Sequence, residues 1–292
     1  MPYCVKCGKE LADDARFCSQ CGTPVGGYDA SAQGLVDKID VNYPEAESVG
    51  LVMIMGASSM EIGPGSEKFV EGTIEYDTPE WKPFVSTLGN TVRIEQTQDL
   101  HTYMHYPPLN RWNLKLGDTK PFSIELSAGV GRANLNLGKL PITHLFVETG
   151  AGDNRISFKE PNPSTMKNLE VRAGAGELSL SNLLNANFEK MRIKGAVGSI
   201  ELDFAGEKLQ RNAYVYVGSG VGGVTVTMGT GIPARARVRG LTGVRSYGGF
   251  FRSGGGFGDS EYQTEAYMSA TGPKIELELD LGVGGVTLRT SP

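Results

Sequence analysis

The chain has 292 residues, with 28 basic and 33 acidic side chains and a formal net charge of −5. Nucleic acids and anionic lipids are recognised through an excess of positive charge, which this composition lacks, so neither is expected as a partner. The longest apolar stretch, 49–57, is far shorter than the ~20 residues of a membrane helix. We expect a cytoplasmic protein without a transmembrane segment and with about two domains by length.

Residues 1–25 carry all the cysteines, as two Cys-x2-Cys pairs separated by ten residues. The four thiols belong to Cys4, Cys7, Cys18 and Cys21. Two such pairs, each followed by a glycine, are typical of a zinc ribbon, in which four thiolates surround one tetrahedral zinc ion. Two disulfides are the alternative, but no secretory segment precedes the first pair. A four-cysteine site has no open coordination position, so the predicted Zn2+ is structural.

The ribbon contains three basic and three acidic residues, before the zinc–thiolate centre adds about two negative charges. A surface that binds phosphates needs a basic excess. A nucleic-acid-binding regulator that acts through the ribbon is therefore an alternative, and its charge count disfavours it.

Residues 26–42 have the composition of a flexible linker, with paired glycines and several polar or charged side chains. The next region, 43–120, holds short strand-like segments between Pro and Gly breaks. It shows no glycine register like that of the later sequence. A repeat domain needs an atypical end unit to cover its open edge, so we interpret 43–120 as an N-terminal cap of the same domain.

Residues 121–292 are organised by a recurring glycine with a fixed apolar pattern around it. The register glycines are Gly131, Gly152, Gly176, Gly198, Gly222 and Gly284. Positions seven and five residues before each glycine are apolar, and so, with Asn154 as the exception, are positions two and four residues after it. This is the alternation of two β-strands that meet at a corner. Glycine suits the corner because a Cβ forbids the backbone angles of a sharp bend.

The first five register glycines are 21, 24, 22 and 24 residues apart. This period predicts a mainly β protein built as a single-stranded β-solenoid, in which each rung covers the apolar face of the next. Between Gly222 and Gly284 the period is interrupted. The excess includes a Gly-rich and aromatic segment followed by an alternating one, which predicts a hairpin insertion projecting from a rung at about 245–270.

The sequence also resembles a known family. The run 57–96 leads into Trp112–Leu116 and the glycine repeats, and 138–152 is especially similar to the bacterial toast-rack family. Relatives of that family include the C-terminal domain of LiaF-like envelope-stress proteins and solenoids described as adhesins. The resemblance implies a β-solenoid with a role in envelope-stress sensing or protein interaction, and no catalysis.

A solenoid hydrolase is a further alternative. If neighbouring rungs stack in register, Glu148 lies beside Arg172 and Glu170 beside Arg192, so these carboxylates are expected in ion pairs. His101 and His105 could share one strand face, but no third metal ligand accompanies them. We therefore predict no catalytic residues and no enzyme. The expected function is a zinc-binding interaction protein with protein partners, and an oligomer could form through a solenoid edge.

Overall fold

The structure is a computed structural model. It describes residues 3, 7, 9, 10, 34–97, 109–256 and 258–291. The chain divides into two compact units, Met1–Gly34 and Leu35–Pro292. In the first unit, Tyr3 and Glu10 form an antiparallel β-bridge. None of the described helices is long and apolar enough to cross a membrane.

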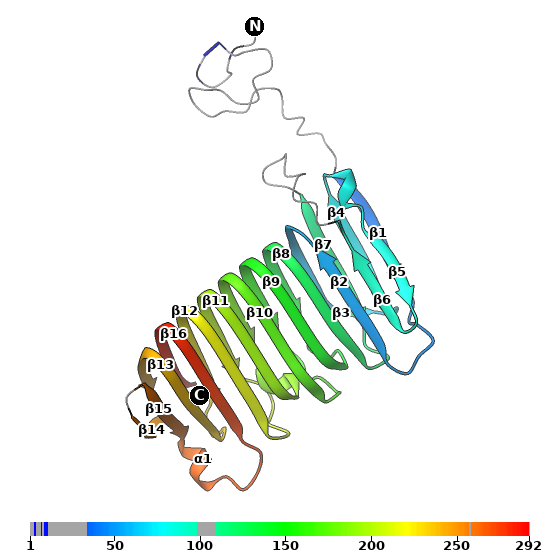
Figure 1. Cartoon of the computed structure of the whole chain (residues 1–292). Helices are drawn as coiled ribbons and strands as arrows, with labels where there is room; N and C mark the ends of the chain where they lie inside the picture. Colours follow the sequence, from blue (N-terminus) through cyan, green and yellow to red (C-terminus); the bar gives the residue numbers. More distant parts are fainter. Residues whose placement is uncertain are drawn as a thin grey trace. The chain divides into compact units, whose positions relative to one another are not determined.

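The second unit is a rack of parallel strands, each of which forms one rung (Figure 1). Its regular strands are β8 (Phe122–Asn136), β9 (Ile142–Ser157), β10 (Met166–Ser181), β11 (Phe188–Phe204), β12 (Ala213–Gly229) and β16 (Ile275–Ser291). All six register glycines stand opposite one another in this stack. The sequence prediction of a mainly β solenoid, and of its register, is confirmed.

The register glycines have φ values from 123° to 155°, a region that side chains other than glycine rarely adopt. Space forbids a side chain as well. A Cβ built on Gly176 would lie 2.1 Å from the carbonyl oxygen of Gly152, and one on Gly198 would lie 1.8 Å from that of Gly176. Each of these corners therefore packs backbone on backbone, which explains why glycine returns in all six regular strands.

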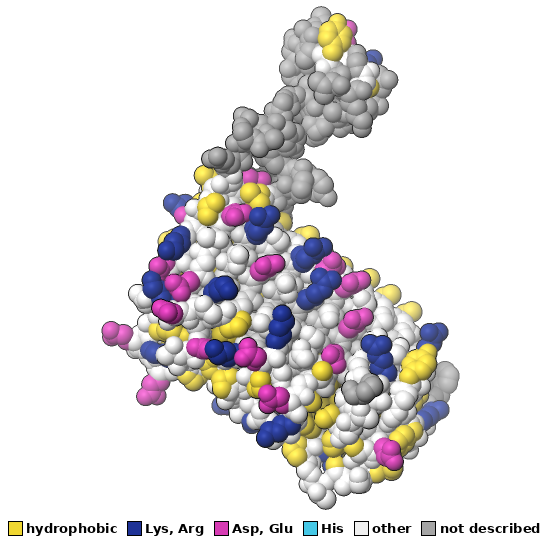
Figure 2. Space-filling view, turned by 180° about the vertical axis from the view of Figure 1, so that it is seen from behind, with side chains coloured by type: hydrophobic (Ala, Val, Ile, Leu, Met, Phe, Trp, Pro, Cys, Tyr) yellow, Lys and Arg dark blue, Asp and Glu magenta, His cyan; other side chains and the backbone are white. Residues whose placement is uncertain are grey.

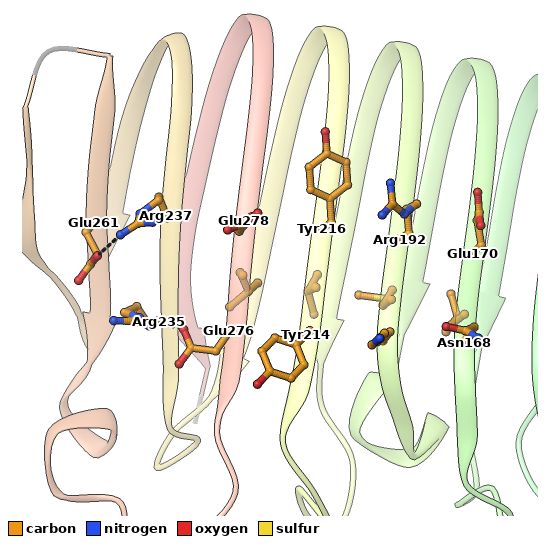
Figure 3. Close-up of a pocket in the computed structure, with 15 residues that line it drawn as sticks. Asn168, Glu170, Arg192, Tyr214, Tyr216, Arg235, Arg237, Glu261, Glu276 and Glu278 are labelled. Atoms are coloured by element: carbon orange, nitrogen blue, oxygen red, sulfur yellow. Dashed lines mark hydrogen bonds and ion pairs between the residues drawn. The ribbon is translucent and has the colours of Figure 1, made fainter.

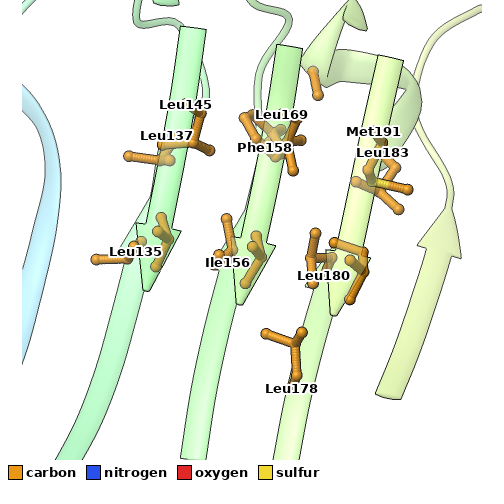
Figure 4. Packing of buried hydrophobic residues seen from close by; sticks show 14 of the residues in the cluster. Leu135, Leu137, Leu145, Ile156, Phe158, Leu169, Leu178, Leu180, Leu183 and Met191 are labelled. Atoms are coloured by element: carbon orange, nitrogen blue, oxygen red, sulfur yellow. The ribbon is translucent and has the colours of Figure 1, made fainter. Parts of the chain in front are cut away.

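The core lies between the two halves of each bent strand. The side chains before the glycine, such as Leu145 and Leu169, face those after it, such as Ile156 and Leu180 (Figure 4). These side chains are at most 2% exposed. Burying one Leu or Ile side chain contributes about 1.5–3 kcal/mol, so the repeated slots supply the main stabilisation of the rack.

The N-terminal region contains a seventh rung, which our sequence analysis missed. Strand β2 (Val49–Met55) pairs with the first half of β8, and β3 (Ser58–Ser66) pairs with its second half. Ser58 stands opposite Gly131, and Met60 and Ile62 occupy the buried slots that follow it. The region 43–120 thus does hold the register. The pattern escaped detection because a serine replaces the glycine at the register position.

The remaining N-terminal strands form a further layer and its cover. They are β1 (Leu35–Val41), β4 (Val70–Tyr76), β5 (Phe84–Leu88), β6 (Thr91–Glu95) and β7 (Asn110–Gly117), with the 3-10 turn η1 (Pro79–Trp81). Strands β6 and β7 pair in parallel with β2 and β3. Antiparallel β5 then covers β6, and β4 followed by β1 covers β7. The prediction that this region caps the same domain agrees with the division into units.

The predicted linker 26–42 is wrong at its C-terminal end, because 35–41 is strand β1. Ile39 in this strand is 2% exposed. Strand β1 pairs in antiparallel orientation with β4, which lies some thirty residues further along the chain. Because the partner is distant in sequence, the local composition of β1 did not indicate a strand.

Side-chain amides lie buried where β6 and β7 meet. Asn110 Nδ2 donates to Gln96 Oε1 at 2.8 Å and to the carbonyl oxygen of Ala57 at 2.9 Å. Gln96 Oε1 also accepts from Trp112 Nε1 at 3.1 Å, while Gln96 Nε2 donates to the carbonyl oxygen of Trp81 at 2.6 Å. A buried polar group without a hydrogen-bond partner lowers the stability of the folded state. This network therefore stabilises the layer only while each side chain keeps its partners.

At the C-terminal end, spatial order departs from chain order. The strands are β13 (Ala234–Tyr247), β14 (Phe250–Gly256) and β15 (Asp259–Thr264), followed by helix α1 (Glu265–Ser269). Strand β16 inserts between β12 and β13, so the last strand of the chain lies inside the stack. The hairpin predicted at about 245–270 exists as β14 and β15. It does not project from a rung, because β15 pairs with β13 and extends the sheet.

The face shown in Figure 2 carries interspersed acidic and basic side chains. The register brings Glu148 beside Arg172 and Glu170 beside Arg192, as predicted. The expected ion pairs across the strands do not form. Arg172 instead bonds Glu170 of its own strand at 2.8 Å, since residues two apart in a strand project from the same face.

Candidate functional site

A shallow groove of about 580 Å3 lies on the outer face of the first halves of β10, β11, β12, β16, β13 and β15 (Figure 3). The side chains that stand up from its floor are Asn168, Glu170, Lys190, Arg192, Tyr214, Tyr216, Arg235, Arg237, Glu261, Glu276 and Glu278. The floor itself consists of buried residues of the repeat, such as Met191 and Val215. The groove is therefore lined by outward-facing side chains of neighbouring strands that pair in a regular register.

Three neighbouring strands give the groove a separation of charge. Outward positions of β11 are basic: Lys190 and Arg192 line the groove, and Lys194 continues the row beyond it. The same positions of β12 are Tyr214, Tyr216 and Gly218, and those of β16 are Glu276, Glu278 and Asp280. Because neighbouring strands lie about 4.8 Å apart, a cationic row and an anionic row flank an uncharged aromatic row at about 10 Å from each other.

Strand β13 engages most of the anionic row. Arg235 Nε donates to Glu276 Oε2 at 2.8 Å, and Tyr267 of α1 donates to the other oxygen of that carboxylate at 2.7 Å. Arg239 lies 3.8 Å from Asp280 Oδ1. Arg237 faces away from β16 and bonds Glu261 at 3.3 Å (Figure 3). These contacts hold Glu276 and Asp280 beside β13, whereas Glu278 between them has no ion pair among the described residues.

The basic row is different. Within the described ranges, none of the side chains Lys190, Arg192 and Lys194 has a carboxylate within 4.0 Å, and all three residues are exposed. The Arg192 guanidinium lies over the Tyr216 ring at 5.2 Å from its centroid, a cation–π contact that leaves its N–H donors available. This row can therefore bind anionic groups supplied from outside.

The two tyrosines of β12 have different settings. Tyr216 is half-buried, and burial together with the nearby Asp280 carboxylate raises the pKa of its hydroxyl. Its hydroxyl lies above Gly218, where a Cβ would approach that oxygen to 3.1 Å. Tyr214 is 57% exposed. A large aromatic ring that is both exposed and next to unpaired cations is a common feature of binding surfaces.

The predicted zinc ligands lie mostly outside the described residues. Cys7 is described and exposed, at a turn between the bridged residues Tyr3 and Glu10. Cys4, Cys18 and Cys21 lie outside the described ranges, as do His101 and His105. Among the residues that are described, no group of three or more His, Cys, Asp or Glu side chains could hold a metal ion. His144 is exposed on β9, beside Thr143.

Sequence analysis recognised only part of the groove. The register placed Glu170 and Arg192 side by side on outward positions, but the row two residues earlier, with Lys190 and Tyr214, passed unnoticed although the same register would have found it. The sequence did not indicate that Arg235 lines the groove. Its position there depends on β13 pairing with β16 and not with β12.

Two parts of the chain match known domain families. Residues 3–25 match the zinc-ribbon domain, and residues 30–167 match the N-terminal domain of toast_rack, DUF2154. The chain contains a zinc ribbon and a toast-rack N-terminal domain. The toast-rack match ends before β10 is complete, so every residue of the groove lies beyond it.

Solved structures give weaker similarities. A "putative cell adhesion protein" from Clostridium sporogenes ATCC 15579 is 19% identical, with a TM-score of 0.48 over 89% of this chain and 100% of that one. A "Putative lipid binding protein" from Parabacteroides distasonis ATCC 8503 is 8% identical, with a TM-score of 0.28 over 89% of this chain and 97% of that one. No curated protein matches the chain. At these values the two structures indicate no function for this chain.

Proposed function

We propose that this chain is a non-catalytic, zinc-binding interaction protein whose solenoid groove docks a partner protein. One observation carries the proposal: the exposed Tyr214 ring stands between a row of cations without carboxylate partners and a row of carboxylates, of which Glu276 beside Tyr214 is held by Arg235. Such a surface offers an apolar contact with charges of opposite sign on its two sides. This arrangement suits the recognition of a polypeptide, which carries apolar and charged side chains close together.

The chemistry of the groove favours binding over catalysis. A general acid or base must be free to exchange its proton with a substrate. Glu276 accepts from both Arg235 and Tyr267, and Glu261 is bonded to Arg237. Glu276 thereby positions β13 and α1 against β16, and Glu261 joins β15 to β13.

Partner docking can be tested with the full chain as bait and a matched pair of variants. Tyr214 and Tyr247 are 57% and 56% exposed, but only Tyr214 belongs to the groove. Cross-linking followed by mass spectrometry should recover a protein from the native host that is lost with Tyr214→Ala and retained with Tyr247→Ala. If no recovered protein depends on Tyr214, the groove is not the docking site.

The zinc ribbon supplies the second part of the proposal. Cys4, Cys7, Cys18 and Cys21 would hold one Zn2+ as four thiolates, a donor set that zinc prefers. Tyr3 and Glu10, which flank the first Cys-x2-Cys pair in the sequence, form an antiparallel β-bridge. The metal would fold the ribbon and leave no coordination position for a substrate.

Metal analysis of freshly reduced protein should find one zinc per chain, and Cys18→Ser should abolish it. Because the ribbon and the solenoid are separate compact units, the thermal transition of the solenoid should hardly move in this variant. Absence of zinc from the reduced protein would contradict the metal proposal. A nucleic-acid-binding ribbon, the main alternative, would show salt-sensitive recovery of nucleic acid that is lost in Cys18→Ser.

A further inference from the structure

The charge pattern of the groove also indicates what kind of partner it takes. Resting on the proposed docking function, we propose that the groove binds an extended peptide segment that carries carboxylates at alternate positions, laid along β11 and β12. The carboxylates would bind the cationic row of Lys190, Arg192 and Lys194, and the backbone would pass beside Tyr214.

The spacing of the cations carries this proposal. Outward side chains of one strand are two residues apart, which is about 6.6 Å in a parallel sheet. An extended peptide repeats its side chains on one face at nearly the same interval. Acidic residues at positions i, i+2 and i+4 therefore match the three cations of β11 one to one. Contiguous acidic residues would direct every second carboxylate away from the sheet.

The flanking carboxylates fix the position and limit the width of the ligand. Glu170 lies beside Arg192 on one side, and Glu278 lies two strands from Arg192 on the other (Figure 3). No ion pair or hydrogen bond involves the Glu278 side chain among the described residues, so its charge repels an anion placed over β16. The attractive strip is thus one strand wide and three side chains long. A single extended segment fits this strip, whereas a broad polyanion would meet carboxylates on both sides.

The aromatic row completes the fit. Tyr214 offers an exposed ring beside Lys190, against which the backbone of the bound segment can pack. At the other end, the Tyr216 hydroxyl lies over Gly218, beside Lys194. The groove therefore favours acidic residues at alternate positions, with the residues between them directed away from the sheet.

Fluorescence anisotropy with the full chain tests this inference. The probe is a labelled peptide with the core Glu-Val-Glu-Val-Glu, and its control has the core Glu-Glu-Glu-Val-Val, with identical composition and charge. The alternating peptide should bind about tenfold more tightly, since it alone presents all its carboxylates to one face. Equal affinities would overturn the proposal.

Charge reversals in the protein locate the site. Lys190→Glu and Lys194→Glu should each weaken binding of the alternating peptide by about tenfold or more. Lys208→Glu changes the net charge equally at an exposed position outside the groove, and its effect should stay within about twofold. An equal loss with Lys208→Glu would show that only the net charge matters, and the site would be refuted.

Two further probes separate this inference from the docking proposal. A single-stranded DNA oligonucleotide that bound more tightly than the peptide, and in a Lys190-dependent manner, would overturn the peptide in favour of a polyanion. If the alternating peptide does not bind but a host protein is still captured through Tyr214, the docking proposal holds and the inference of an acidic peptide segment is wrong. If the peptide binds through Lys190 and no host protein is captured, the groove binds acidic peptides but the proposal that it docks a host protein is wrong.

Discussion

At both ends of the rack, antiparallel strands cover the last parallel layer, but the two ends differ in how much of that layer is covered. At the N-terminal end, antiparallel β5 covers β6, and β4 and β1 cover β7, so both halves of the last layer are covered. At the C-terminal end, β15 pairs only with Arg235–Arg239 in the first half of β13. The rest of β13 pairs on one side only, with β16.

This difference shows what each end needs from the rest of the chain. Antiparallel strands need only short connections, so either end can be closed by segments that are near in sequence. The C-terminal cover nevertheless depends on the last strand, because β13 reaches the stack only through β16. The N-terminal cover is built outward from β2 and β3, and its outermost strand, β1, supports no other.

Deleting residues 270–292 should break this comparison most strongly. Without β16, strand β13 loses its whole parallel partner and β12 becomes an open edge, so we expect the C-terminal end to lose its hydrogen-exchange protection. A chain that begins at residue 42 lacks the first compact unit but loses only β1 from the rack. Its strands β4 and β7 should keep their hydrogen-exchange protection. Retained protection of β13–β15 in the first deletion would contradict the strand order.

The second prediction compares a register glycine with its N-terminal counterpart. Gly176→Ala should lower the free energy of unfolding by about 3–5 kcal/mol, because it combines a positive φ with a Cβ 2.1 Å from a carbonyl oxygen. Ser58→Ala at the equivalent position should be neutral or slightly stabilising, since the buried Ser58 hydroxyl has no hydrogen-bond partner. Urea melts of the two variants measure the contrast. A greater loss with Ser58→Ala would mean that the corners are not equivalent.

The third prediction compares an inner rung with the outer cover. Leu202 is 1% exposed, whereas Leu88 in β5 is 86% exposed. Leu202→Ala should cost about 2–5 kcal/mol through lost burial and a residual cavity. Leu88→Ala should stay within about 0.5 kcal/mol. Equal costs in denaturant melts would show that β5 is covered in solution, for instance by another copy of the chain.

The smallest expected effect concerns Asp203, one residue beyond Leu202. The strand alternation turns it away from the core side of Leu202, but it is half-buried, and burial raises the pKa of its carboxyl above the usual range. Since the folded state then binds a proton more tightly than the unfolded state, ionised Asp203 disfavours folding above its folded pKa. This cost is relieved as the pH falls through that pKa towards the normal value of Asp.

Asp203→Asn should therefore be neutral or slightly stabilising at neutral pH, and its advantage should vanish at acidic pH. Asp203→Ala should also stay within about 0.5 kcal/mol at neutral pH. Thermal melts at several pH values check both variants. A variant that is less stable than the parent at neutral pH would show that the carboxylate has a favourable role, such as its proximity to Arg289.

Much of the candidate site was within reach of the sequence, because a register that aligns the glycines also aligns the outward residues. Lys190, Arg192, Tyr214 and Tyr216 follow from counting back from Gly198 and Gly222. What could not be predicted is that Glu276 is engaged by Arg235. That contact joins residues 41 positions apart, and it forms only because β16 passes β13.

The sequence by itself determined the bend, the register and the core of the regular rungs. A corner that rejects a Cβ and an alternation that buries every second side chain are local properties, and they repeat at every turn of the coil. The tertiary structure alone decided where the stack ends and in what order its last strands lie. Any rung with the register can pair with any other, so the position of β16 depends on the lengths of its connections and on the combined burial of all the strands.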